Sequence, residues 1–254
     1  MTDAMTTPSA LIVGATGGIG SALTRRLSTA GWRLALCSRG SERLKALGDE
    51  TAAHTEIVDA TNLKNVESAF SAACEKIGRL DGVVNCAGSL LLKPAHITSS
   101  EEWMHTINAN LTTAFNVLRS AASNMMRSGG GSIVLLSSAV AHRGMISHEA
   151  IAAAKAGVVG LALSAAATYA RYNIRVNCVA PGLTRTLLTD SLTKNETSLK
   201  ASTALHPLGR IGEPSEVASA IAWLLDPEQS WVTGQVIAVD GGLSSVQPRP
   251  LAAS

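Results

Sequence analysis

The residues GATGGIG at positions 14–20 determine how the rest of the chain is interpreted. A short apolar run, ALIV (10–13), precedes them, and an amphipathic helical pattern near 18–30 follows them. Glycines between a strand and a helix allow a tight turn and let backbone N–H groups approach a phosphate at the helix N-terminus. A glycine-rich turn alone is a weak signal, but this position between strand and helix favours a dinucleotide site.

Short apolar runs alternate with longer helical patterns along the whole chain. This alternation predicts right-handed crossovers and a parallel sheet with helices on both faces. We therefore predict an α/β fold with a doubly wound, Rossmann-type sheet in a single domain over residues 1–254. The predicted strands are 10–13, 32–37, 54–58, 81–85, 132–137, 174–179 and 235–239. The predicted helices lie near 18–30, 41–51, 62–77, 100–128, 148–172 and 213–225.

Composition argues against several classes of function. The 21 basic and 19 acidic residues give a formal net charge of +2, so nothing favours a nucleic-acid or membrane-surface partner. The apolar stretch 150–170 is interrupted by Lys155 and indicates a buried or interface helix rather than a membrane span. The sequence does not open with a basic segment followed by a long apolar run, the pattern of a secretory signal, so we expect a cytoplasmic protein. The four cysteines lack metal-ligand spacing, so we expect reduced thiols and no metal site.

The end of the second predicted strand distinguishes the two nicotinamide dinucleotides. An acid there binds the ribose 2′-hydroxyl of NAD, whereas Ser38 and Arg39 stand in this chain. A guanidinium can pair with the 2′-phosphate of NADP, and a serine hydroxyl adds a donor. The alternative is that Arg39 is a solvated loop cation. We predict NADP because the acid that NAD would require is absent.

The ordered motifs of the chain resemble the short-chain dehydrogenase/reductase family, in the branch that includes 3-oxoacyl-acyl-carrier-protein reductases. The motifs are the glycine turn, N-x-A-G at 85–88, NANL around Asn110, R-V-N-x-V-x-P-G at 175–182 and V-D-G-G at 239–242. The resemblance implies strand order 3-2-1-4-5-6-7 and a homodimer or homotetramer. It also implies cofactor contacts from Gly14, Thr16, Gly17, Gly18, Ile19, Gly20, Ser38, Arg39, Asp59, Ala60, Asn85, Ala87, Gly88, Lys155, Pro181, Gly182, Thr184 and Thr186.

The chain departs from the family at its catalytic tyrosine. Family spacing assigns the catalytic serine to Ser138 and the lysine to Lys155, and it puts Ile151 in the tyrosine's place. The resemblance implies a proton relay through Asn110 and Lys155, with Ser138 orienting the substrate. Tyr169 and Tyr172 are the two tyrosines of the chain. Tyr169 lies 14 residues beyond Lys155, about 21 Å along a continuous helix, so it cannot replace the missing phenol from there.

His148 is the nearest candidate for a replacement proton donor. It precedes Lys155 by seven residues, so the two share a helix face, and imidazole is the commonest general acid or base. The alternative is that His148 is a surface residue of a helix start in which Ser147 is the cap. His142, in the loop after Ser138, is a weaker candidate of the same kind.

The stretch 184–212 is too long for a simple connection, and we predict an irregular substrate lid there. Small residues on helices 100–128 and 148–172 suggest an oligomer interface, although they could also pack closely on the sheet. We predict an NADP(H)-dependent reductase of a carbonyl or an activated double bond. The alternative is a non-catalytic NADP-binding protein that has lost the chemistry. Leucines of the lid that could line an apolar pocket are Leu187, Leu188, Leu192 and Leu199.

Overall fold

The structure, a computed structural model, describes residues 7–247. These residues contain a seven-stranded parallel sheet in the order β3-β2-β1-β4-β5-β6-β7, which confirms the predicted fold class and strand order. Each predicted strand lies within two residues of the observed one. The strands are β1 (Ser9–Val13), β2 (Arg33–Ser38), β3 (His54–Ile57), β4 (Gly82–Asn85), β5 (Gly131–Leu136), β6 (Ile174–Pro181) and β7 (Val236–Val239).

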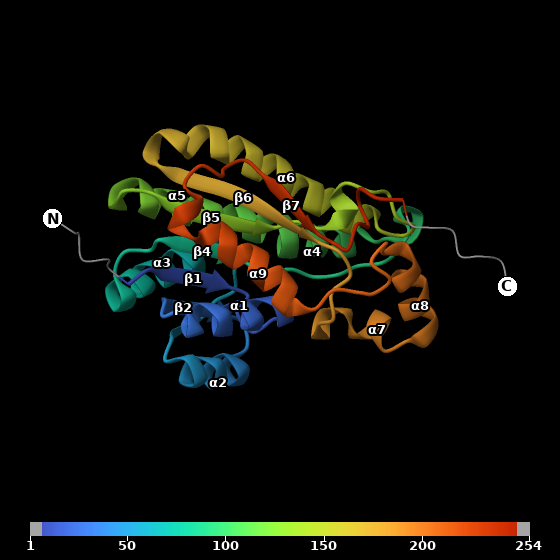
Figure 1. Ribbon diagram of the computed structural model, residues 1–254, viewed down its shortest axis with the longest axis horizontal. Coiled ribbons are helices and arrows are strands. Elements are labelled where there is room, and N and C mark those ends of the chain that lie inside the picture. Colours follow the sequence, from blue (N-terminus) through green and yellow to red (C-terminus); the bar gives the residue numbers. More distant parts are fainter. Residues whose placement is uncertain (1–6, 248–254) are drawn as a thin grey trace.

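Helices cover both faces of the sheet (Figure 1). Along β1, Leu11 and Val13 point to one apolar core, whereas Ala10 and Ile12 point to the other. This two-sided burial explains why the strands are apolar throughout rather than alternating. The first face is covered by α3 (Leu63–Ile77), α5 (Thr113–Ser128) and α6 (Glu149–Tyr169). The second face is covered by α1 (Gly18–Thr29), α2 (Ser41–Thr51) and α9 (Pro214–Leu225).

The strand order reverses at β1, which pairs with β2 on one side and β4 on the other. Val13 is in register with both Cys37 and Asn85, so the carboxyl ends of three strands lie together. Parallel sheets bind their ligands in the crevice outside the carboxyl ends at such a reversal. The glycine turn at 14–20 follows β1 directly into this crevice.

The predicted helix 100–128 is helical over its whole length, with one irregularity in its winding. It is divided into α4 (Ser100–Ile107), a single π turn (Asn108–Thr112) and α5. The π turn carries Asn110, and turns of this kind are frequent at functional sites. The alternative in which Ser147 caps the next helix is wrong. Ser147 has a left-handed φ of 63° and does not cap α6, whose N-cap is His148.

The predicted irregular lid is largely helical. It contains a 3₁₀ turn (Leu187–Thr189), α7 (Asp190–Thr193) and α8 (Glu196–Leu205), shown in orange in Figure 1. The side chain of Asn195 accepts a hydrogen bond from Ser198 N at 2.9 Å and so caps α8. At its base the lid is closed by a bridge between Thr184 and Gly212. Other 3₁₀ turns span Ala95–Ile97, Ala139–Ala141, Ala170–Tyr172 and Pro227–Gln229.

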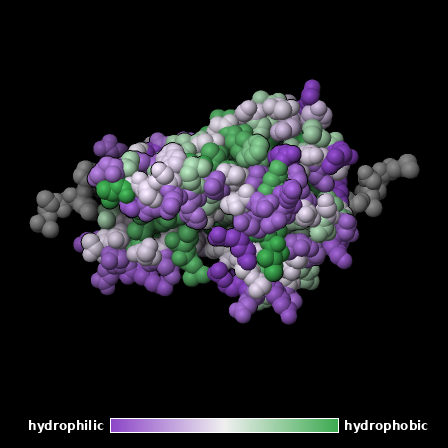
Figure 2. Space-filling view, turned by 180° about the vertical axis from the view of Figure 1, so that it is seen from behind, coloured by the Kyte–Doolittle hydropathy of each residue, from purple (hydrophilic) through white to green (hydrophobic). Residues whose placement is uncertain are grey.

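One helical segment, Glu149–Tyr172, is long and apolar enough to cross a membrane by length and composition alone. Of its most apolar window, 44% is buried inside the protein, and core helices of soluble proteins pass the same test. The surface seen from behind also carries apolar groups among polar ones (Figure 2). Large exposed side chains on α4, α5 and α6 are Trp103, Met104, Phe115, Met126 and Leu163.

Candidate active site

The glycine turn after β1 has the shape of a phosphate site. Gly14 has φ of 78°, and a Cβ there would lie 2.6 Å from the backbone nitrogen of Ala87, so glycine is required. Helix α1 then begins at Gly18 with no capping side chain and no acid in its first turn. Its first N–H groups are therefore open to an anion, which fits a pyrophosphate.

A cleft of about 430 Å³ runs along the carboxyl ends of β1, β2 and β4. It brings together most of the residues predicted to bind the cofactor. These are Gly14, Thr16, Gly17, Gly18, Ile19, Gly20, Ser38, Arg39, Asp59, Ala60, Ala87, Gly88 and Thr186. The structure places the other predicted residues outside the lining of this cleft, namely Asn85, Lys155, Pro181, Gly182 and Thr184.

One corner of the cleft combines hydroxyl and guanidinium groups. The hydroxyls of Thr16 and Ser38 lie 2.6 Å apart, and Arg39 lines the same corner. Arg43, in the first turn of α2, also lines it and was missed in the sequence analysis. Its signal was available, since Arg43 follows Arg39 by four residues. No acid ends β2, so the corner suits a phosphate better than a free hydroxyl.

Asp59 also lines the cleft. Its carboxylate accepts hydrogen bonds from the Thr61 hydroxyl at 2.8 Å and the Thr61 backbone nitrogen at 3.0 Å. These bonds, with a smaller contribution from the Arg39 charge, hold the pKa of Asp59 below its usual range. The group is therefore an ionised acceptor that can receive hydrogen bonds from a base or ribose.

Asn110 and Lys155 converge on Gly88 at the inner end of the cleft. A Cβ on Gly88 would lie 2.8 Å from Asn110 Oδ1 and 3.6 Å from Lys155 Nζ. The Asn110 side chain is fixed because Nδ2 donates to Thr106 O at 2.9 Å and to Ser89 Oγ at 3.1 Å. Asn85 is also buried and ties β4 to Thr113.

Lys155 is a buried cation whose charge is costly in this position. Its ammonium group donates to Leu136 O at 2.9 Å, and it forms no ion pair with any described residue. Burial lowers the pKa of Lys155 to about 8, an effect that the neighbouring thiols of Cys178 and Cys86 partly oppose. The group can therefore change protonation in the range of ordinary assays.

A second, smaller cavity of about 200 Å³ lies beside this inner end, under the lid. It brings together Ser138, which follows β5, and His148 and Ile151, which lie at the start of α6. Pro181 and Gly182 line it as well, at the end of β6. The remaining walls are mostly apolar and comprise Leu90, Leu92, Ala139, Val140, Met145, Leu183, Thr189, Leu192, Ser202, Leu205, His206 and Leu243.

The two serines at the end of β5 have different positions. Ser137 is buried and donates to Lys155 O at 2.9 Å, so it anchors α6. Ser138 lines the small cavity, and its hydroxyl reaches Pro181 O at 3.5 Å, which is too long for a strong bond. Its oxygen also accepts a long hydrogen bond from Val140 N at 3.4 Å, and its hydrogen is available to a ligand. Ile151 is 3% exposed and gives the cavity an apolar wall at the position predicted for the family's tyrosine.

His148 presents one ring nitrogen to the protein and leaves the other uncommitted. Nδ1 lies 2.7 Å from Ile146 O, so it carries a hydrogen and donates to that carbonyl. No residue of the described range 7–247 is hydrogen-bonded to Nε2. Because His148 lines the cavity, Nε2 is the nitrogen that can exchange a proton with a ligand.

Other candidates lie elsewhere. His142 is exposed and does not line the cavity, and Tyr169 and Tyr172 lie at the far end of α6 from Lys155. Of the four lid leucines, Leu192 lines the cavity, whereas Leu187 and Leu188 line the cofactor cleft and Leu199 lines an outer surface hollow. Sequence analysis missed His206, because nothing in HPLGR (206–210) indicates that this ring reaches β6.

Comparisons with known proteins agree with this geometry. The family profile described as enoyl-(acyl carrier protein) reductase matches residues 14–244. A carbonyl reductase family member 4 of Xenopus laevis is 37% identical over 237 residues, covering 91% of this chain and 96% of the relative. A 3-oxoacyl-[acyl-carrier-protein] reductase of Thermotoga maritima is 37% identical over 242 residues, covering 92% and 96%. A solved actinorhodin polyketide ketoreductase with NADPH matches with TM-score 0.90 and 32% identity, covering 94% and 98%.

Proposed function

This chain belongs to the short-chain dehydrogenase/reductase family, in its 3-oxoacyl-acyl-carrier-protein reductase-like branch, and from this premise we propose that it reduces a carbonyl with NADPH, using His148 as proton donor. The family places the chain among oxidoreductases that act on carbonyls. We further propose that the cofactor is NADP and that His148 takes the place of the family's proton donor. The observation that carries the proposal is the free Nε2 of His148 in a cavity that also contains Ser138.

The corner formed by Thr16, Ser38, Arg39 and Arg43 supports the choice of NADP. Two guanidinium groups and two hydroxyls offer charge-assisted bonds to a 2′-phosphate, and no carboxylate ends β2 to repel it. The turn at Gly14 and the uncapped start of α1 fit the pyrophosphate. When bound, NADPH supplies the hydride that a carbonyl carbon accepts.

The residues of the chain supply orientation and the proton. Ser138 donates a hydrogen bond to the substrate oxygen and so aligns the carbonyl. His148, protonated at Nε2, transfers a proton to that oxygen as negative charge develops, and its Nδ1–H remains on Ile146 O. Lys155 would hold the nicotinamide ribose and, with Asn110 beside it at Gly88, would form the predicted proton relay. The products are an alcohol, NADP⁺ and neutral His148.

The apolar lining suggests a hydrophobic substrate. The cavity offers leucine, valine and methionine side chains around Ser138, so an apolar ketone or thioester fits better than a sugar. An activated double bond is the second substrate class, because its reduction also needs a hydride and a proton.

Ile151 favours a second candidate function. An isoleucine cannot donate a proton, so the chain could bind NADP without turnover and serve a structural or regulatory role. The two functions share the cofactor cleft and differ only in the small cavity. Turnover therefore distinguishes them, and cofactor binding does not.

The test is NADPH consumption by the purified protein with a panel of ketones, quinones and enoyl thioesters. The proposal predicts consumption with at least one carbonyl and none when that compound is omitted. Tight NADPH binding without consumption across the panel would support the non-catalytic function. Equal binding of NADPH and NADH would contradict the cofactor assignment.

A further inference from the structure

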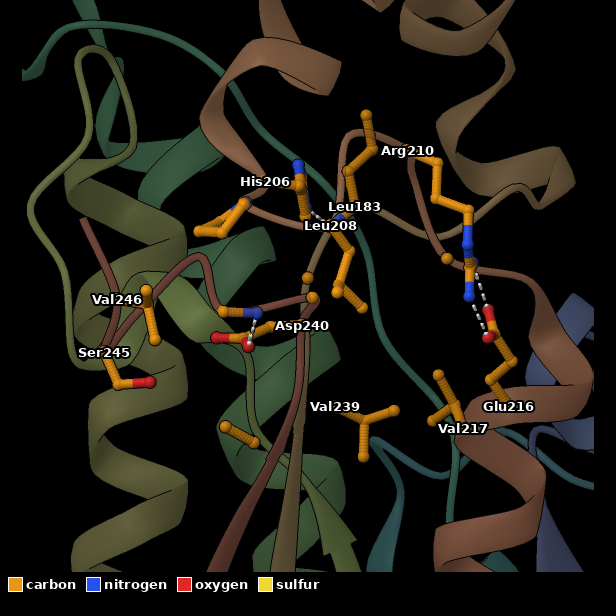
Figure 3. A pocket seen from close by; sticks show the side chains of 16 residues that line it. Leu183, His206, Leu208, Arg210, Glu216, Val217, Val239, Asp240, Ser245 and Val246 are labelled. Carbon is orange, nitrogen blue, oxygen red and sulfur yellow. Dashed lines mark hydrogen bonds and ion pairs between the residues drawn. The ribbon is translucent and has the colours of Figure 1, made fainter. Parts of the chain in front are cut away.

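His206 forms a wall between two cavities. It follows the last residue of the lid helix α8, is 4% exposed, and lines the small cavity beneath the lid. On its other side lies a larger hollow of about 540 Å³, lined also by Asp240 and Arg210 (Figure 3). This hollow contains none of the residues that line the cofactor cleft. The proposed reaction assigns no role to this buried imidazole.

Both ring nitrogens of His206 are bonded to backbone. Nδ1 lies 2.7 Å from Ser202 O, and Nε2 lies 3.2 Å from the backbone nitrogen of Leu183. An amide N–H can only donate, so Nε2 accepts and Nδ1 carries the hydrogen. His206 is therefore held as a neutral ring with no nitrogen left for a ligand. This arrangement separates it from His148, which lines the same cavity and keeps Nε2 available.

The two bonds connect the lid to the end of β6. Ser202 lies in the last turn of α8, where helix carbonyls lack partners within the helix. Leu183 follows Pro181 and Gly182 at the end of β6, and its N–H points to the imidazole in Figure 3. The side chain of His206 thus bridges the lid helix α8 and the end of β6.

The imidazole of His206 packs closely against the backbone at Gly182. A Cβ on Gly182 would lie 2.8 Å from His206 Nε2 and 2.9 Å from Asp240 Cα. The backbone is therefore held between the ring and the segment after β7, with no room for a side chain. The predicted cofactor contacts Pro181, Gly182 and Thr184 all belong to this backbone segment.

The base of the lid is closed independently of His206. Arg185 N donates to Gly212 O at 2.9 Å, and Gly212 N donates to Leu183 O at 2.9 Å. These bonds fix where the lid leaves and rejoins the domain. These bonds do not reach α8, so the position of α8 over the cavity depends on contacts further along the lid. The two hydrogen bonds of His206 are such contacts.

We propose that His206 is a positioning residue that ties lid helix α8 to the Gly182–Leu183 backbone and so holds the nicotinamide end of the cofactor site in its binding shape. The inference rests on the cofactor part of the proposed function. It assigns His206 no contact with the reacting atoms.

The test compares a cofactor with its fragment. His206→Leu removes both hydrogen bonds at similar size, and His206→Gln keeps an acceptor and a donor. Calorimetry should give about tenfold weaker NADPH binding for His206→Leu, the effect of a lost hydrogen bond, and a change below about threefold for His206→Gln. Adenosine 2′,5′-bisphosphate reaches only the Arg39 corner, so its affinity should not change in either variant. The exposed His96→Leu is the matched control.

A second readout follows the lid without any cofactor. Lys194 and Lys200 are exposed on the lid, and trypsin should cut after them about tenfold faster in His206→Leu than in the unmodified protein or His206→Gln. The inference is overturned if His206→Leu binds NADPH normally, if it loses NADPH and the fragment alike, or if lid cleavage does not change. If the unmodified protein binds neither ligand, the proposed function fails, and the trypsin result still decides the role of His206.

Discussion

The cofactor cleft and the small cavity are built in opposite ways. The cleft is assembled largely from segments between Val13 and Gly88, and much of its binding capacity is backbone N–H and glycine. The cavity is assembled from segments between Leu90 and Leu243, and its chemistry depends on a few side chains on apolar walls. A backbone site tolerates many sequences, whereas a side-chain site changes its chemistry with one substitution.

Ile151 illustrates the consequence of that difference. In the cleft, the family motifs, the turn geometry and the charged corner all favour a dinucleotide site. In the cavity, Ile151 stands at the position predicted for the family's tyrosine, while Ser138 lines the same cavity and Lys155 lies four residues further along α6. The comparison teaches that cofactor binding and catalysis must be tested separately in this protein.

The largest effect should come from returning a phenol to the cavity. In a His148→Ala protein, adding Ile151→Tyr should raise carbonyl reduction by about 10²–10⁴-fold, the usual contribution of a positioned general acid. Steady-state kcat with the best carbonyl of the panel measures this rise. Ile151→Phe is the matched control, because it adds the ring without the hydroxyl. Equal rates for the tyrosine and phenylalanine variants would show that Lys155 cannot activate a phenol at this position.

Arg39→Asp should change the cleft and leave the cavity unaltered. Loss of the guanidinium and repulsion of the 2′-phosphate should weaken NADPH binding on the order of 100-fold, so that NADH becomes the preferred cofactor. Calorimetric titration with both dinucleotides measures the change. Lys45→Asp makes the same charge change on α2 outside the cleft and should have little effect. An unaltered NADPH affinity in Arg39→Asp would identify Arg39 as a solvated cation.

The sequence predicted the cleft better than the cavity for a physical reason. Thr16 lies in the turn after β1 and Ser38 ends the adjacent strand β2, and strand order places such residues together without knowledge of side chains. His206 and Leu183 are brought together by the path of the lid, which no local pattern describes. The π turn at Asn110 was also missed, since a one-residue change in helical winding leaves the apolar pattern nearly intact. The helices of the lid were missed although Asn195 offered a cap signal.

Lys155 joins the two regions, and its burial should appear as a pH-dependent stability. Its pKa is about 8 in the folded protein, below the ordinary 10.5, so between these values the unfolded chain binds a proton that the folded one does not. Stability of the unmodified protein should therefore rise from pH 8 to 10.5, and the cost of burial is fully present below pH 8.

Lys155→Met should remove this cost in the unliganded protein. The gain at pH 7 should be about 3 kcal/mol or less, because each unit of pKa shift corresponds to about 1.4 kcal/mol and Leu136 O loses its donor. Chemical denaturation at pH 7, 8, 9 and 10 measures the difference between the two proteins. A difference that stays constant over this range would show that Lys155 is not a buried cation at pH 7.

The smallest effect on either region should come from the exposed apolar residues of α4, α5 and α6. We expect a symmetric oligomer through this face, with a light-scattering mass at least twice 26.2 kDa. Phe115 is 49% exposed on α5, and Phe115→Asp should lower that mass while changing NADPH affinity less than about twofold. A monomer in the unmodified protein would remove this face as an interface.

Single-turnover reduction in His148→Ala and His148→Gln tests the relocated proton donor most directly. With NADPH saturating in all three proteins, the account predicts a fall of about 10²–10⁴-fold in the rate of carbonyl reduction for both variants, with NADPH affinity unchanged. An undiminished rate in His148→Ala would contradict the account, because the donor would then be a group other than the free Nε2 of His148.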